Sequence, residues 1–411
     1  MKRVFLLVIS AAFFANASDL NAILEYALSH NELSVSKDLD TKKPLLERQS
    51  IQKEYFPKID IGAIYQRSDP RAFFRPGDTY DAHAKISLNL FDGNKKRYQI
   101  DAKKFERQSL KFASESFKKG LQFDIVNLYF QVKTLRANLV ALQKASEYLD
   151  AEYKRVEDLY NVGSVTEDEV KKIEASLLNT VYQIDEMHYR IEEAKKELSL
   201  RVGKSINGIG SSKIAPPAAT VKSDTLDRIK TLEARQKAVE YSAASLDSAY
   251  LPQVNMEDSY HLYGYDRTDS FHPKGEDHEN RIMLTFNMRL YDNGSVKKQK
   301  EAILVQKLSL QQQITYYEKE QKKNIELALL NIETIKSQIT SAEKSLEAAN
   351  KAFELITNRY HEGAVTVVDY LDALKVKTNA MAQYKAALYS LQVAYATYYL
   401  YINEDIKEFV R

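Results

Sequence analysis

The 411-residue chain contains no cysteine, only 12 glycines and 8 prolines, and almost no net charge. The absence of cysteine excludes disulfides, thiolate metal sites, cysteine nucleophiles and a lipidated N-terminal cysteine. The scarcity of glycine and proline leaves too few turns for the two or three compact domains that this length would allow. A net charge of +2 gives no basic footprint, so we expect no nucleic-acid partner.

The sequence also lacks the residue spacings of common catalytic and cofactor sites. It contains neither a His-Glu-x-x-His metal motif nor a Gly-x-x-x-x-Gly-Lys phosphate loop. His272, Asp277, His278 and Glu279 lie in one segment and could bind a metal, but a solvated charged loop is the favoured interpretation. We therefore expect no enzyme activity, no cofactor and no metal site.

The first seventeen residues have the pattern of a secretory signal peptide. Lys2 and Arg3 form a positive start, residues 4–14 form an apolar run too short to span a bilayer, and Ala15-Asn16-Ala17 offers small residues for cleavage. An ordinary N-terminal membrane anchor is the alternative. We expect residues 1–17 to be a signal peptide and the chain to be exported.

The rest of the chain consists of two related halves. Four residues recur 200 positions later: Tyr160, Gly163, Val165 and Thr166 as Tyr360, Gly363, Val365 and Thr366. A segment rich in Gly, Ser, Pro and Ala separates the halves at 203–222. We expect a first structural repeat at 18–202, this linker, a second repeat at 223–403 and a tail at 404–411.

Each half contains one very long predicted helix, at about 95–160 and 295–360. Apolar residues of the second half alternate spacings of three and four, which is the heptad pattern of a coiled coil. These seam residues are Ile325, Ala328, Ile332, Ile335, Ile339, Ala342, Leu346, Ala349, Phe353, Ile356 and Tyr360. The equivalent residues 125–160 keep the pattern except at Ser146. Each helix would be roughly 100 Å long.

A tight tip is predicted to end each long helix, at 161–165 and 361–365, before a return helix at 166–202 or 366–403. Gly163 and Gly363 suit the left-handed conformation that ends a helix. Thr166-x-x-Glu169 and Thr366-x-x-Asp369 match the capping box that begins the next helix. Shorter helices are expected within 19–55 and 223–250.

Four segments alternate apolar and polar residues, at 58–66, 80–91, 253–263 and 280–291. This alternation is typical of membrane-barrel strands, although a half-buried strand of a soluble protein is the alternative. The longest uncharged run, residues 386–402, carries five tyrosines and favours a buried helix over a membrane helix. Four strands cannot close a barrel, so strands in lipid would require several copies of the chain. Two copies and three copies would both satisfy the minimum of about eight strands for a bacterial barrel.

The duplicated order of these features resembles the TolC outer-membrane factor family. YFPKIDIGA and YLPQVNMED open the strand regions, LFDG and LYDNG close them, and RYHEGAVTVVDYLDA forms the second tip. The resemblance covers essentially the whole mature chain. It implies a mainly α fold with membrane β-strands: a homotrimer in which four strands per chain form a twelve-stranded transmembrane β-barrel, continued by a long antiparallel α-helical barrel with an equatorial region near the linker.

The family also implies a function and partners. The expected location is the outer membrane of a Gram-negative cell, among its lipids, extending into the periplasm. The expected function is the exit duct of a tripartite efflux or type I secretion system. A periplasmic adaptor (membrane fusion) protein and an inner-membrane pump of the resistance-nodulation-division, ABC or a similar class would open its tips. The alternative is a soluble periplasmic coiled-coil adaptor or scaffold protein.

The same resemblance assigns a constriction at the tips. Asp369 and Asp372, three residues apart on one helix face, would form carboxylate rings at the narrow, cation-attracting entrance. Helix capping by Asp369 and simple solvation of Asp372 are the alternatives. Asp168 and Glu169 stand where the family tends to have a Thr-Asp pair.

Tyr360 matches the family's gating aromatic residue, with packing in the helix seam as the alternative. Val365 stands where the family has an arginine, so a closed state would need hydrogen bonds from Tyr360 or apolar contacts in place of a salt bridge. The adaptor is expected to dock on six tip residues, whose glycines also serve the turns: Val162, Gly163, Ser164, Glu362, Gly363 and Ala364.

Overall fold

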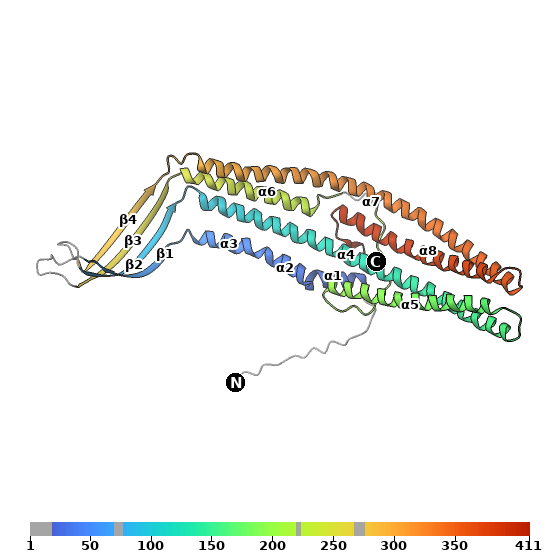
Figure 1. Cartoon of the computed structure of the whole chain (residues 1–411). Helices are drawn as coiled ribbons and strands as arrows, with labels where there is room; N and C mark the ends of the chain where they lie inside the picture. Colours follow the sequence, from blue (N-terminus) through green and yellow to red (C-terminus); the bar gives the residue numbers. More distant parts are fainter. Residues whose placement is uncertain (1–18, 70–76, 219–222, 267–275) are drawn as a thin grey trace, which may run out of the picture. The chain divides into compact units, whose positions relative to one another are not determined.

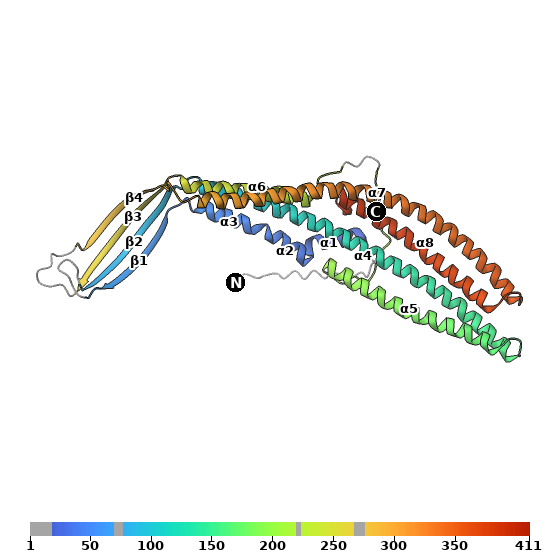
Figure 2. The ribbon, with the colours of Figure 1, turned by 45° about the horizontal axis from the view of Figure 1, so that its top comes forward.

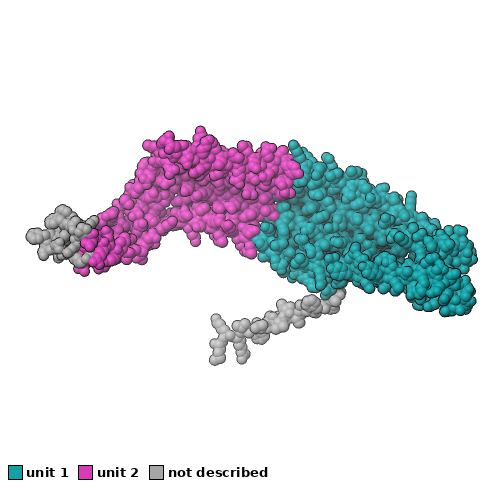
Figure 3. All heavy atoms as spheres, viewed as in Figure 1, with its two compact units in different colours: residues 1–37, 114–227, 318–411 teal, residues 38–113, 228–317 magenta. Residues whose placement is uncertain are grey.

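The computed structural model describes residues 19–69, 77–218, 223–266 and 276–411. The predicted signal peptide at 1–17 lies outside these ranges. Two compact units make up the chain (Figure 3), unit 1 from residues 1–37, 114–227 and 318–411 and unit 2 from residues 38–113 and 228–317. Within the described ranges, no helix combines the length and the apolar character needed to cross a membrane.

Unit 2 contains a four-stranded antiparallel sheet in the order β1-β2-β3-β4 (Figure 1). Its strands are β1 (Lys58–Arg67), β2 (Asp78–Phe91), β3 (Gln253–Asp266) and β4 (His278–Asn287). The first two belong to the first half of the sequence and the last two to the second half. The halves therefore meet where β2 pairs with β3.

The two faces of this sheet differ in chemistry, because the side-chain period along a strand is two. On one face Ile59 lies opposite Ile86 and Met256 lies opposite Leu284, and the other face carries the polar residues of β2. The apolar face is exposed in the single chain, with Ile61 86% exposed. Asp258 lies on this apolar face, and nothing in the structure explains it.

The fourth strand is displaced from its expected range. β4 covers 278–287 where the alternation suggested 280–291, and Met288 to Tyr291 form no strand. The cause lies in its neighbour, since β3 begins at Gln253, which pairs with Asn287. Pro252, immediately before β3, has no backbone N–H with which to extend the ladder.

Helices continue each strand in the same lateral order within unit 2, as Figure 1 shows. Figure 2 shows the same order for the strands, with α6 and α7 overlapping in that view. They are α3 (Lys42–Lys53), α4 (Lys95–Asn161), α6 (Asp227–Leu246) and α7 (Ser295–His361), and α4 and α7 continue into unit 1. A short 3-10 helix, η1 (Asp247–Tyr250), follows α6. Side-chain contacts join the neighbours: Glu47–Lys103 (2.6 Å) between α3 and α4, Phe105–Tyr241 (ring centroids 5.4 Å apart) between α4 and α6, and Glu240–Lys307 (3.1 Å) between α6 and α7.

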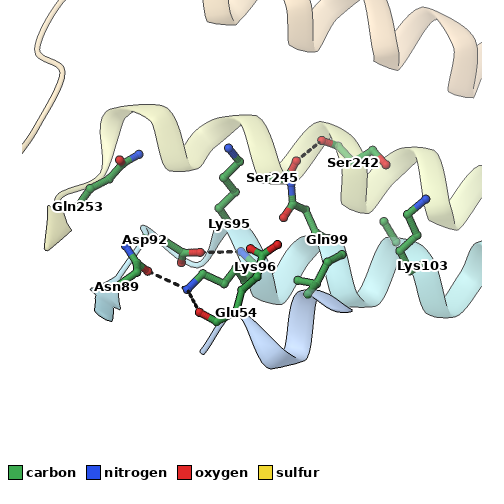
Figure 4. A pocket seen from close by; sticks show the side chains of 12 residues that line it. Glu54, Asn89, Asp92, Lys95, Lys96, Gln99, Lys103, Ser242, Ser245 and Gln253 are labelled. Carbon is green, nitrogen blue, oxygen red and sulfur yellow. Dashed lines mark hydrogen bonds between the residues drawn. The ribbon is translucent and has the colours of Figure 1, made fainter. Parts of the chain in front are cut away.

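A polar hollow of about 690 Å³ lies at the junction of strands and helices in unit 2 (Figure 4). In it, the buried Lys96 ammonium donates to Asn89 Oδ1 at 2.8 Å and to the Glu54 carbonyl at 3.4 Å. Asp92 accepts the Lys96 backbone N–H at 2.9 Å, and Asp292 makes the equivalent bond at the start of α7. The duplicated aspartates thus begin the two long helices.

Unit 1 contains α1 (Leu20–His30), α5 (Glu167–Val202), α8 (Val367–Tyr401), the 3-10 helix η2 (Ile406–Phe409) and the remainder of α4 and α7. Between α1 and α3 lies α2 (Glu32–Asp40). The long helices and the return helices lie within two residues of their expected ranges. One core packs the C-terminal part of α8, where Tyr399 stacks on Phe409, against α1 and α4. The uncharged run at 386–402 is therefore part of a helix that contributes to this core.

A second core lies beside the tips and includes seam residues of both repeats, among them Leu149, Val156 and Phe353. The two repeats differ at the end of the seam. Tyr360 is 5% exposed, whereas its counterpart Tyr160 is 43% exposed. The heptad pattern predicted that both tyrosines lie in the apolar seam. This prediction is wrong for Tyr160, whose side chain is exposed.

Candidate functional site

The two tips share one turn geometry. Gly163 and Gly363 have φ of +76° and +74°, in the left-handed region where a side chain is disfavoured. The Ser164 N–H donates to the Leu159 carbonyl at 2.8 Å, and the second tip makes the equivalent bond. These 6→1 bonds satisfy the last carbonyls of α4 and α7, so the duplicated glycines end the helices as expected.

The second tip begins α8 with a complete capping box. Asp369 Oδ2 accepts the Thr366 backbone N–H at 2.9 Å, and the Thr366 hydroxyl accepts the Asp369 N–H at 3.3 Å. The bonds from the Thr366 hydroxyl and then its backbone N–H lower the pKa of Asp369 below its ordinary value. Asp369 and Asp372 are both exposed. The Asp369 carboxylate therefore caps α8 and at the same time remains accessible to solvent.

The first tip lacks the expected capping box. The Thr166 hydroxyl donates to Asp168, and Glu169 does not reach back to the backbone of Thr166. Glu169 instead accepts a hydrogen bond from Tyr360, so the tertiary contact replaces the local cap. Asp168 stays exposed, and its bonds to Thr166 and to Lys172, at 2.9 Å, lower its pKa. The same Thr-x-x-acidic spacing thus gives a capping box in the second repeat and a hydrogen bond between helices in the first.

The contact between Tyr360 and Glu169 joins α7 to α5. The Tyr360 hydroxyl lies 2.5 Å from Glu169 Oε1, and its ring stacks on Tyr370 with centroids 5.2 Å apart. Burial raises the pKa of Tyr360 far above its ordinary value, and the bond to the Glu169 carboxylate raises it further. The hydroxyl is therefore held in its protonated, donating form.

A second contact between the two hairpins was not identified from the sequence. The buried Glu152 carboxylate of α4 lies 2.5 Å from Arg155 and, through Oε2, 3.0 Å from His361 Nε2 at the end of α7. The Arg155 guanidinium lies 5.2 Å from the Tyr360 ring centroid. The three-residue spacing of Glu152 and Arg155 could have indicated their ion pair. Nothing in the local sequence could have indicated His361, which is 209 positions away from Glu152.

The six predicted docking residues are all exposed, with Val162 74% exposed. They comprise Val162, Gly163 and Ser164 at the first tip and Glu362, Gly363 and Ala364 at the second. Val365 packs partly buried against the core beside the tips. The tips therefore expose two glycines and the side chains of Val162, Ser164, Glu362 and Ala364 to solvent, next to the core beside the tips.

Comparison with known proteins identifies the family. The family model described as outer membrane efflux protein matches residues 47–204 and 227–404, which is more than half of the chain. The chain belongs to this family. The resemblance inferred from the duplicated motifs is thereby confirmed, and membership of the outer membrane efflux protein family makes the chain an outer-membrane protein.

Individual relatives agree with this assignment. The outer membrane protein TolC of Salmonella enteritidis is 21% identical over 388 residues, covering 90% of this chain and 77% of that protein. The Campylobacter jejuni CmeC outer membrane channel has a similar structure, with a TM-score of 0.81 and 18% identity over 94% of this chain and 86% of CmeC. The outer membrane protein VceC of Vibrio cholerae has a similar structure as well, with a TM-score of 0.77 and 16% identity over 94% of this chain and 96% of VceC. The mainly helical fold with one four-stranded antiparallel sheet in the described ranges is the fold shared with CmeC and VceC.

Proposed function

We propose that the chain forms a homotrimeric exit duct for a tripartite efflux or type I secretion system. Four strands from each copy would complete a twelve-stranded barrel in the outer membrane, and the helices would form a hollow barrel in the periplasm. In this proposal residues 1–17 are the signal peptide, 18–202 and 223–403 are the two repeats, and 203–222 and 404–411 belong to the equatorial region.

The sheet supports the need for several copies. β1 and β4 are its two edges, and Ile61 of β1 and Leu284 of β4 expose 86% and 67% of their surfaces on the apolar face. In hydrocarbon, each unpaired backbone group at an edge would cost several kcal/mol. Because bacterial barrels use at least about eight strands, one copy is too few and three copies suffice.

Helices of unit 1 also leave an apolar stripe without a partner in the single chain. Leu178, Tyr182 and Tyr189 lie on α5 at spacings of four and seven and are 62%, 67% and 67% exposed. Single exposed apolar residues are ordinary, but residues at these spacings share one helix face. A neighbouring copy would cover this face in the proposed helical barrel.

The tips suggest how such a duct would close and open. Tyr360–Glu169 and His361–Glu152 both join the α7–α8 hairpin to the α4–α5 hairpin of the same copy. In the closed trimer these contacts would hold the hairpins together, and Asp369 and Asp372 of three copies would form carboxylate rings. An adaptor protein docked on the exposed tip residues, with its inner-membrane pump, would separate the hairpins.

The single observation that carries this proposal is the exposed apolar face of a sheet with two free edges. The test is purification of the full chain from outer membranes in detergent, followed by native mass spectrometry and recording in planar bilayers. We expect a mass of three chains and discrete channel currents. A monomer recovered from the soluble periplasm without channel activity would contradict the duct and favour the adaptor or scaffold alternative.

A further inference from the structure

Three side chains with metal-ligating atoms meet on the polar face of the sheet. Asp81 Oδ1 lies 2.9 Å from His261 Nδ1, and Asp81 Oδ2 lies 3.3 Å from His83 Nδ1. One candidate donor atom from each residue lies within 4.8 Å of the other two. All three side chains are largely shielded, with exposed fractions of 14% for Asp81, 17% for His261 and 23% for His83.

The register of β2 and β3 creates this cluster. His83 of the first repeat is the direct cross-strand partner of His261 of the second, and their ring centroids are 5.1 Å apart. Asp81, two residues before His83, points to the same face because side chains alternate along a strand. Each repeat therefore supplies part of the ligand set, and neither contains it alone.

The surroundings hold the rings in place. Gly62 of β1 lies opposite His83, and a Cβ at this position would be 2.6 Å from His83 Nε2. The missing side chain thus makes room for the imidazole. On the other side Tyr263 stacks on His261 with a 5.6 Å centroid separation, and the Tyr263 hydroxyl donates to Glu279 Oε2 at 3.1 Å. Both histidines are positioned by groups that do not belong to the cluster.

The hydrogen bonding around His83 is incomplete. Its Nδ1 is buried and makes no hydrogen bond of acceptable geometry within the described part of the chain, despite the nearby Asp81 oxygen. A buried ring nitrogen without a partner is unfavourable. A cation between the carboxylate and the two imidazoles would satisfy this nitrogen.

We propose that Asp81, His83 and His261 bind a divalent transition-metal ion that links β2 to β3. Two imidazoles and one carboxylate suit Zn²⁺ and related first-row ions and leave one position for water. Tetrahedral bonds of about 2.1 Å place ligand atoms roughly 3.4 Å apart. The 3.3 Å between Asp81 Oδ2 and His83 Nδ1 already lies close to this value, and the 2.9 Å between Asp81 Oδ1 and His261 Nδ1 is shorter by about 0.5 Å. The site lies within one sheet of one chain, so it does not depend on the exit-duct proposal.

Zinc titration of the detergent-solubilised full chain, after removal of metals with a chelator, tests the proposal. We expect one Zn²⁺ per chain by calorimetry and a zinc-dependent rise in the melting temperature. His83→Gln and His261→Gln should each weaken binding by about 100-fold or more, because each removes one of three protein ligands. His188→Gln, which changes an exposed histidine of α5, is the matched control and should bind like the wild type.

Gly62→Ala provides a variant that keeps all three ligands. Its new methyl group would displace the His83 ring, so we expect a loss of about 10–100-fold in zinc affinity, as for other groups that orient metal ligands. Zinc K-edge absorption of the wild-type protein should show two imidazole ligands. Because this measurement needs no variant, it tests the ligand set even if a variant fails to fold. Absence of saturable zinc binding, a spectrum without imidazole, or wild-type affinity in both histidine variants would overturn the site. These outcomes are independent of oligomeric mass and channel current.

Discussion

The hydroxyl of Tyr360 in α7 donates a 2.5 Å hydrogen bond to the carboxylate of Glu169 in α5, 191 positions away in the sequence. Val365 cannot form the salt bridge that an arginine would form at its position. The Tyr360–Glu169 bond, together with the His361–Glu152 contact, supplies polar links between the two hairpins. The Tyr360–Glu169 bond is the basis of the first two predictions.

Tyr360→Phe should shift the proposed duct toward its open state. The change removes the hydroxyl but keeps the ring stacked on Tyr370, so only the bond to Glu169 is lost. A hydrogen bond to a charged group contributes about 1.5–3 kcal/mol. We expect a higher open probability in planar bilayers. Glu169→Ala, which removes the acceptor, should act similarly, and the double variant should add little to either single change.

Tyr160→Phe is the matched control for this experiment, because Tyr160 occupies the equivalent position of the first repeat and is half exposed. It should leave the open probability unchanged. Equal open probabilities for the wild type and Tyr360→Phe would show that the bond does not hold the tips closed.

The stability of the tips should fall at alkaline pH. Burial raises the pKa of Tyr360 in the folded chain above the value of about 10 for an unfolded tyrosine. A raised pKa contributes stability that is complete below the unfolded value and is lost as the pH rises through the folded value. The melting temperature, followed by circular dichroism between about pH 8 and 11, should therefore decline above about pH 10.

Tyr360→Phe removes this group and should show a shallower alkaline decline. Tyr370, whose pKa burial also raises, is present in both proteins and contributes equally to both curves. Parallel curves for the wild type and the variant would rule out a role for Tyr360 in the alkaline transition.

Asp369→Asn combined with Asp372→Asn should weaken block of the channel current by divalent or trivalent cations. The asparagine oxygen at 369 can still accept the backbone bond of the capping box, so the charge is removed while the helix start is kept. Carboxylates lining a narrow passage concentrate cations, and we expect the blocking concentration to rise by about tenfold or more. Asp185→Asn, at an exposed position further along α5, should leave the block unchanged. If block persists in the double variant, these carboxylates do not line the constriction.

Leu284→Lys should reduce assembly in the outer membrane far more than Thr285→Lys does. These neighbours in β4 project to opposite faces, Leu284 to the apolar face opposite Met256 and Thr285 to the polar face opposite Asn255. A lysine facing lipid near the bilayer midplane costs about 2–4 kcal/mol, whereas one facing water costs little. The measurement is the fraction of each variant recovered as assembled protein from outer membranes. Similar losses for both variants would argue against a lipid-facing apolar side.

Repetition and periodicity were sufficient to predict most of the fold. The heptad spacing predicted the long helices, and Gly163 and Gly363 marked their ends because glycine, without a Cβ, adopts the left-handed turn at no steric cost. Strict alternation predicted the strands. It failed at the end of β4, where pairing with β3 stops at Asn287, because the existence of a partner strand is not encoded in the strand's own sequence.

The sequence by itself therefore determined the helices and the tip turns, which depend on contacts between residues a few positions apart. Tertiary structure decided which side chains meet. Glu169 has the spacing of a helix cap, yet it bonds to Tyr360, and Asp81 and His83 meet His261 only through the register of strands from different halves. Such pairings depend on which elements become neighbours in space, and the spacing of residues along one helix or strand carries no information about its neighbour.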